Sequence, residues 1–374
     1  MCKVRIDSTA GMLVSLLGTL LVAAACAGVP QAVSGPETNR GPDWVYNTAT
    51  VYPEDRFVSA VGYGLDRETA EKNALGALVA VFGQTVRGET TAAYRYSQAV
   101  SEGLIDIGER TEIDSAVKTS FAMHTLVGVE IMDRWVDNQG THYAVAVMER
   151  LRGGILYGGL IDSNKEILRN LTNLSGEELN TLDACIRYNL AATVADANTL
   201  FMNVLSVLNP ASSLALRDEN RSGEYYRLRA REIAQNIPIT VQVDQDRAGR
   251  IGTVFSRAIS DAGFRIGSVP SRYVLEAAFS LHEVDLPQNP NKFVRYIVDA
   301  GLRDTVTGQI FFPYSINGRE GHITLSEAEN RAISAAETEI LSSYSKALRS
   351  WLVWSPPPES SGQAKAGAFS PAQP

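Results

Sequence analysis

The apolar run near the start of the chain constrains the rest of the molecule most strongly, because it decides in which compartment the remainder folds. Lys3 and Arg5 precede a stretch without charged residues from Met12 to Ala25. A basic start, an apolar segment and small residues before a cleavage point are the three parts of a secretory signal peptide. We therefore expect residues 1–25 to be removed on export, which leaves 349 of the 374 residues to fold.

Cys26 directly follows three alanines, the first of which is Ala23. This arrangement resembles the lipobox of bacterial lipoproteins, in which the cysteine thiol receives a diacylglyceryl group and the cysteine becomes the new N-terminus. The resemblance implies lipidation at Cys26, and two or three acyl chains such as palmitate make a lasting anchor. It departs from the family at Ala23, where leucine is usual. The alternatives are a signal peptide cut nearby with an incidental cysteine, or an uncleaved anchor.

Composition narrows the functional classes. Hydrophobic residues make up 45% of the chain and charged residues 20%, which is typical of a globular protein. The net charge of −8 and the lack of a basic cluster argue against binding to nucleic acid. No later apolar run approaches the roughly 20 residues that a transmembrane helix requires. We therefore expect contact with the membrane through the N-terminal lipid.

Few residues suggest chemistry. Once Cys2 is removed and Cys26 is lipidated, Cys185 remains as a buried structural thiol without a disulfide partner. None of the four histidines, His124, His142, His282 and His322, is spaced i, i+4 from another metal ligand. We predict no catalytic residues, no metal site and no cofactor.

The order of predicted elements indicates an α+β fold, with two small α+β domains that contain antiparallel sheets and are joined by a helical segment. The predicted divisions are the signal peptide (1–25), the lipidated cysteine and a flexible tether (26–42), the first domain (43–150), the helical segment (151–236), the second domain with the order β-α-β-β-β-α (237–354), and a disordered tail rich in Pro, Ser and Gly (355–374).

In the first domain we predict a strand from Phe57 that ends at Gly62 and Gly64, an N-cap at Asp66 and a helix through residue 82. Residues 85–96, rich in Thr and Tyr, should be extended. Residues 125–137 and 141–148 should form a hairpin. The later segments predict helices at 155–171, 177–208, 219–233, 250–263 and 326–351, and strands at 239–243, 273–284, 293–303 and 309–316.

The first domain has a familiar sequence pattern. Asp43-Trp44, the strand ending in Gly62-Tyr-Gly64, the alanine-spaced helix and the hairpin led by Trp135 resemble the Lpp-twenty (LPP20) family of bacterial outer-membrane lipoproteins. The resemblance covers roughly residues 43–150. It implies a structural or interaction role in the cell envelope, with envelope proteins, peptidoglycan-linked assemblies or further copies of the chain as partners. Ala27, unlike the aspartate that retains some lipoproteins in the inner membrane, favours the outer membrane.

Two other functions compete with this hypothesis. Ser115-Ala-Val-Lys118 and Ser343-Tyr-Ser-Lys346 both fit the Ser-x-x-Lys motif of penicillin-recognising serine enzymes, with Ser315-Ile-Asn317 and the degenerate Lys365-Ala-Gly367 as further motifs. The chain would then act on the cell wall or on a β-lactam. The third hypothesis is a periplasmic binder of small ligands with a cleft between its domains.

Some motifs favour a structural interpretation. The segment from Gly62 to Arg67 lies where a phosphate-binding turn would open a helix, but we expect a turn that needs glycine at positive φ. Trp44 and Trp351 should be core residues at the ends of elements. Trp354, next to a run of prolines, is either a partner anchor or part of an exposed terminus.

Overall fold

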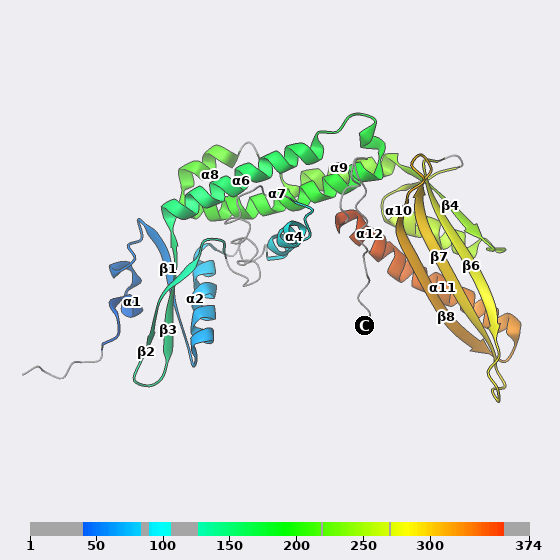
Figure 1. Ribbon diagram of the computed structural model, residues 1–374, viewed down its shortest axis with the longest axis horizontal. Coiled ribbons are helices and arrows are strands. Elements are labelled where there is room, and N and C mark those ends of the chain that lie inside the picture. Colours follow the sequence, from blue (N-terminus) through cyan, green and yellow to red (C-terminus); the bar gives the residue numbers. More distant parts are fainter. Residues whose placement is uncertain (1–39, 84–89, 106–125, 218–219, 269–270, 355–374) are drawn as a thin grey trace, which may run out of the picture. The chain divides into compact units, whose positions relative to one another are not determined.

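The computed structural model describes residues 40–83, 90–105, 126–217, 220–268 and 271–354 (Figure 1). The predicted signal peptide, Cys26, most of the tether and the predicted tail lie outside these residues. By the contacts between its residues, the chain divides into two units, Met1–Arg40 and Gly41–Pro374. The division of the second unit into two domains and a helical segment therefore remains a prediction.

The first sheet has three antiparallel strands in the order β1-β3-β2, with α2 packed on one face (Figure 1). The predicted strand, helix and hairpin are confirmed here. The short α1 and η1 pack on the other face. The bounds are α1 (Asp43–Tyr46), η1 (Thr48–Thr50), β1 (Phe57–Gly64), α2 (Arg67–Val81), β2 (Glu130–Val136) and β3 (His142–Glu149).

Helix α2 begins at its predicted cap, because the Asp66 carboxylate accepts the backbone N–H of Thr69 at 2.8 Å. The reason we expected for the glycine before it was wrong. Gly62 does not have positive φ. Instead, a Cβ at Gly62 would lie 2.0 Å from the backbone nitrogen of Ala74. The glycine is therefore needed because α2 lies directly against β1.

The prediction of an extended segment at residues 85–96 was wrong where the structure describes it, because α4 (Thr90–Ser101) is a helix. Tyr96, Ala99 and Val100 share one buried face at helical spacing. The Tyr96 ring packs edge-to-face on Phe201, with the two ring centroids 5.6 Å apart. Packing of this face outweighs the preference of Thr and Tyr for strands.

The helical segment contains the predicted helices and one helix that we did not predict, α8. Their bounds are α6 (Arg150–Thr172), η2 (Glu178–Asn180), α7 (Leu182–Leu208), α8 (Pro210–Arg217) and α9 (Gly223–Asn236). Contrary to expectation, α7 is long and apolar enough to cross a membrane, although 72% of its most apolar stretch is buried inside the protein. Cys185 lies in α7, and burial raises the pKa of its thiol to about 12, consistent with a structural thiol.

The second sheet has five strands in the order β5-β4-β6-β7-β8, with helices α10 and α11 against one face (Figure 1). The α+β class is confirmed, and β6, β7 and β8 are antiparallel as expected. Strand β4 pairs in parallel with β5 and β6, since the chain crosses over through α10. The bounds are β4 (Pro238–Asp244), α10 (Arg250–Asp261), β5 (Arg265–Ile266), β6 (Tyr273–Val284), β7 (Lys292–Asp304), β8 (Ile310–His322), α11 (Leu325–Glu339), the π-helix η3 (Ile340–Tyr344) and α12 (Ser345–Trp354).

Candidate interaction surface

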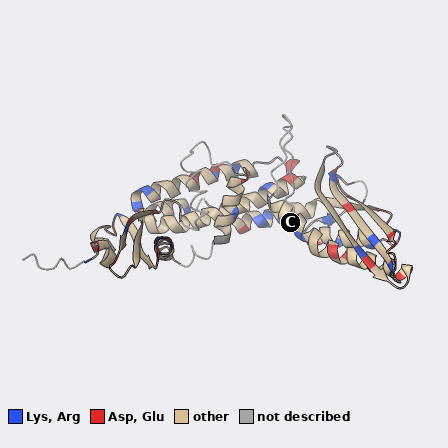
Figure 2. Cartoon of the chain, turned by 60° about the horizontal axis from the view of Figure 1, so that its bottom comes forward, with Lys and Arg blue, Asp and Glu red and all other residues tan. Residues whose placement is uncertain are grey.

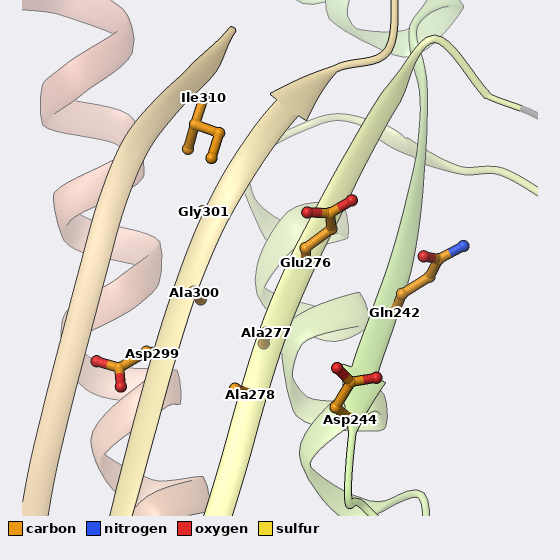
Figure 3. Close-up of a pocket in the computed structure, with 9 residues that line it drawn as sticks. All are labelled: Gln242, Asp244, Glu276, Ala277, Ala278, Asp299, Ala300, Gly301 and Ile310. Carbon is orange, nitrogen blue, oxygen red and sulfur yellow. The ribbon is translucent and has the colours of Figure 1, made fainter. Parts of the chain in front are cut away.

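The two faces of the second sheet differ in what covers them. Ile239, Leu275 and Val298 are fully buried in the core that the sheet shares with its helices. Successive residues of a strand point to opposite faces. Alternate positions such as Gln242 and Asp299 therefore lie on the other face of the sheet, away from α10 and α11 (Figure 3). We call this the helix-free face.

The helix-free face contains a hollow of about 520 Å³. Small residues such as Ala278 and Gly301 form its floor, and carboxylates from three strands stand around it (Figure 3). A Cβ at Gly301 would lie 2.7 Å from a side-chain carbon of Ile310, so the glycine makes room for that side chain. The lining residues are Gln242, Asp244, Glu276, Ala277, Ala278, Asp299, Ala300, Gly301 and Ile310.

The rim of the hollow is acidic. Glu276 pairs with Arg303 at 2.8 Å, but both side chains are about two-fifths exposed, so solvent screens the pair. Asp299 accepts a hydrogen bond from the Ser315 hydroxyl at 2.6 Å, which orients the carboxylate without neutralising it. Within the described residues, Asp244 and Asp299 make no ion pair. The hollow therefore suits a positively charged group.

The hollow is shallow and does not form a metal centre. Gln242, Asp244, Ala278 and Asp299 are all exposed. Among the described residues, no group of three or more His, Cys, Asp or Glu side chains is arranged to hold a metal ion. Small-molecule sites usually enclose most of their ligand. An open acidic hollow instead matches a lysine or arginine side chain on the surface of another protein.

The serine motifs are not brought together where the structure describes them. The Ser343 hydroxyl donates to the backbone carbonyl of Glu339 at 2.8 Å and lies 2.6 Å from the Tyr314 hydroxyl, while Lys346 is exposed. Ser315 follows Tyr314 in β8 and points to the helix-free face, where it bonds Asp299. Ser343 and Ser315 therefore lie on opposite sides of β8. Ser115, Lys118 and Lys365 lie outside the described residues.

The described histidines lie on strands of the two sheets. His142 lies on β3 and His282 on β6, where the His282 ring is 3.1 Å from the Ser280 hydroxyl. His322 ends β8, and its ring nitrogen is 3.4 Å from the backbone nitrogen of Thr324. His124 lies outside the described residues, as does Cys26.

The predicted aromatic core residues are also found. Trp44 is buried, and its indole N–H donates to the Asp133 carboxylate at 2.9 Å. Trp351 is half-buried beside Phe311 and Phe312. Both observations confirm the structural interpretation of these residues.

Sequence reasoning missed the residues of the hollow. Asp246 lies in the turn before α10, where its carboxylate accepts the backbone N–H groups of Arg250 and Gly252. Asp244 lies on β4, two residues after Gln242 on the same face. The sequence signal that could have located the hollow is the alternation of polar residues with Ile239, Val241 and Val243 along this strand.

Comparison with known proteins supports the family resemblance. Residues 42–149 match the model of the LPP20 lipoprotein family, which covers less than a third of the chain. No curated protein matches the chain at a significant level. The match supports a lipid-anchored lipoprotein of the bacterial cell envelope.

Several solved structures are similar to parts of the chain. The secreted protein HP1454 from Helicobacter pylori is 13% identical with a TM-score of 0.38, over 76% of this chain and 98% of its own. The lipoprotein GNA1162 from Neisseria meningitidis is 18% identical with a TM-score of 0.20, over 29% and 99%. A minor lipoprotein from Acinetobacter baumannii is 11% identical with a TM-score of 0.23, over 31% and 90%. These TM-scores are too low to support a functional argument.

Proposed function

We propose that this chain is a non-catalytic lipoprotein, anchored in the outer membrane through Cys26. In this proposal, the helix-free face of its second sheet binds an envelope protein that presents lysine or arginine side chains. The acidic hollow at Asp244, Glu276 and Asp299 is the observation that supports the binding role most directly. The LPP20 match at residues 42–149 supports the location.

Charge complementarity is the reason for preferring a basic protein partner. Acidic and basic residues are interspersed over the elements of the second sheet and its helices (Figure 2). The hollow is a local exception, because within the described residues its three carboxylates have Arg303 as their one ion-pair partner. Complementary charges steer partners together and fix their register, and like charges in the same place cost several kcal/mol.

The binding role can be tested with one substitution and a matched control. Asp244→Lys reverses the charge at the rim, at an exposed residue without an ion pair within the described part of the chain. Glu329→Lys makes the same change of charge at an exposed residue of α11, in the helical layer. A photocrosslinker at Ala278 in the lipidated full chain would capture the partner from intact envelopes.

We expect Asp244→Lys to lower the yield of the crosslinked partner by about tenfold or more, since a penalty of 1.4 kcal/mol already corresponds to a factor of ten. Glu329→Lys should leave the yield unchanged. Equal yields for both variants, or no product above that of a crosslinker at Glu329, would contradict the binding role.

The anchor has an independent test. Cys26→Ser should release a soluble protein from the membrane fraction. If the variant stays with membranes after a high-salt wash, the anchor lies elsewhere and the proposed location is wrong.

The enzyme hypothesis is tested by covalent labelling with a fluorescent penicillin. Labelling that disappears in Ser115→Ala would establish the serine enzyme and overturn the non-catalytic role. We expect neither labelling nor any dependence on Ser115.

A further inference from the structure

Three aromatic side chains lie side by side across the first sheet. Tyr63 of β1 is the antiparallel partner of Tyr143 in β3, and Tyr143 is the partner of Trp135 in β2. The ring centroids are 6.3 Å apart for Tyr63 and Tyr143, and 5.3 Å apart for Tyr143 and Trp135. Directly paired residues point to the same face of a sheet. The three rings therefore form a continuous row, which we call the aromatic row.

The aromatic row lies on the face opposite α2 and extends beyond the part of that face that α1 covers. Trp44 of α1 packs on Val145 and Val147, farther along β3. At the other end of the strands, Tyr63 is 67% exposed. Tyr143 and Trp135 are half-buried and pack against the same cluster as Trp44, so Tyr63 is the solvent-exposed end of the row. Exposed apolar side chains that gather at one place mark interaction sites.

Other apolar side chains at this end of the sheet are also exposed. Tyr46, at the end of α1, is 61% exposed. Leu65, two residues after Tyr63, is 91% exposed. Tyrosine and tryptophan combine an apolar ring with a polar group, and for that reason they concentrate where a membrane meets water.

The length of the chain limits how far the lipid anchor can lie from this row. Gly41 packs on the Trp135 ring, where a Cβ would lie 2.9 Å from a ring carbon. The 15 residues from Cys26 to Arg40 connect this point to the expected lipid. Whatever their conformation, they span at most about 50 Å. Such a short connection keeps the aromatic row at a high local concentration beside the bilayer.

We propose that the aromatic row docks on the lipid–water interface of the membrane that holds the lipid of Cys26. This inference rests on the lipidation in the proposed function and is independent of the acidic hollow. Asp133 and Asp137 lie beside the row, each bonded to an aromatic residue, so attraction to anionic lipids does not drive docking. Insertion of the aromatic rings and of Leu65 drives docking. We therefore expect membrane binding to depend only weakly on salt.

A fluorescent label at the end of the row tests the proposal. Leu65→Cys, labelled with a polarity-sensitive fluorophore, is studied in the lipidated full chain on vesicles of phosphatidylethanolamine and phosphatidylglycerol. Labelling is confined to the new thiol, because Cys185 is buried and Cys26 is acylated. The matched control is Ala80→Cys, at an exposed residue of α2 on the other side of the sheet.

We expect blue-shifted emission at residue 65 and quenching by headgroup-level nitroxide lipids that is several-fold stronger than at residue 80. Tyr63→Ser should move the emission of the Leu65 label towards its value in water. Equal quenching at residues 65 and 80 in protein whose acylation is confirmed by mass would overturn the docking and leave the anchor intact. Absence of acylation would instead refute the anchor itself.

The same label also tests whether a second copy of the chain, and not the membrane, covers the aromatic row. In the Cys26→Ser protein without vesicles, the emission at residue 65 should remain that of a fluorophore in water. A blue shift that grows with protein concentration, together with the mass of a dimer, would show that another copy covers the row and would overturn the membrane proposal.

Discussion

Gly62→Ala should destabilise the first domain, although it adds a single methyl group to a residue with ordinary backbone angles. The new Cβ would lie 2.0 Å from the backbone nitrogen of Ala74 and 2.5 Å from the carbonyl oxygen of Ala70. Favourable contacts of this kind are about 3.5 Å long. Both atoms belong to the backbone of α2, so no side chain can rotate away. The helix must shift outward by more than an ångström or β1 must distort.

Overpacking of a core typically costs about 1–3 kcal/mol, and a contact with a rigid backbone belongs at the upper end of that range. A second glycine of the same domain provides a control, because its substitution should change the stability in the opposite direction. Gly76, an exposed residue within α2, has no atom within 4 Å of its added Cβ. Gly76→Ala should therefore stabilise the helix by about 0.5–1 kcal/mol, through helix propensity alone.

Hydrogen exchange followed by mass spectrometry measures both changes locally, in peptides from β1 and α2 of the full chain. At about 3 kcal/mol, Gly62→Ala should speed exchange by about a hundredfold, whereas Gly76→Ala should slow it by a few-fold. The reasoning would be refuted if Gly62→Ala exchanged within a factor of two of the wild type (about 0.4 kcal/mol).

Three further predictions concern buried groups. Asn164→Leu removes an acceptor of the Tyr96 hydroxyl at 2.7 Å and a donor to the Asn198 side chain at 2.8 Å, and should cost about 3 kcal/mol in urea denaturation; a cost near zero would show that these bonds contribute little. Burial alone would raise the pKa of Asp304, but hydrogen bonds, chiefly from Arg272, lower it overall. The ionised Asp304 carboxylate therefore stabilises the folded protein at pH values above its pKa in the unfolded chain, about 3.9. This stabilisation is lost as the pH falls through the lower pKa of the folded state. Acid unfolding of the second sheet should thus depend less on pH in Asp304→Asn, and an unchanged profile would contradict this role. Because its pKa is about 12, the Cys185 thiol should resist alkylation at pH 8 until urea unfolds the protein, and rapid labelling of the native chain, read by mass, would argue against its burial.

Local signals located most of the elements. The helix after Asp66 was predicted because an N-cap and a four-residue apolar spacing act within a few residues of each other. Residues 273–284 were predicted as a strand, now seen as β6, because a strand-forming run set off by turn residues is likewise a local signal. The segment now seen as α4 was mispredicted, because its Thr and Tyr residues favour strands locally, whereas its fold depends on Tyr96 meeting Phe201 more than 100 residues later.

The candidate surfaces could not be predicted in the same way. The sequence shows that Asp244, Glu276 and Asp299 occupy polar positions of strands, but the strand order β4-β6-β7 places them around one hollow. A shift in strand register by one residue would move each side chain to the opposite face. Register is set by the packing of both faces and of the helices, which no single strand encodes.

By itself, the sequence determined the alternation of helices and strands, and it predicts a secretory leader and a lipidation site at Cys26, because each depends on neighbouring residues. The tertiary structure alone decided that Gly62 provides room for α2 and does not form a left-handed turn. It also decided that Tyr63, Tyr143 and Trp135 form one row. Both results depend on the distance between segments far apart in the chain, and that distance is a property of packing.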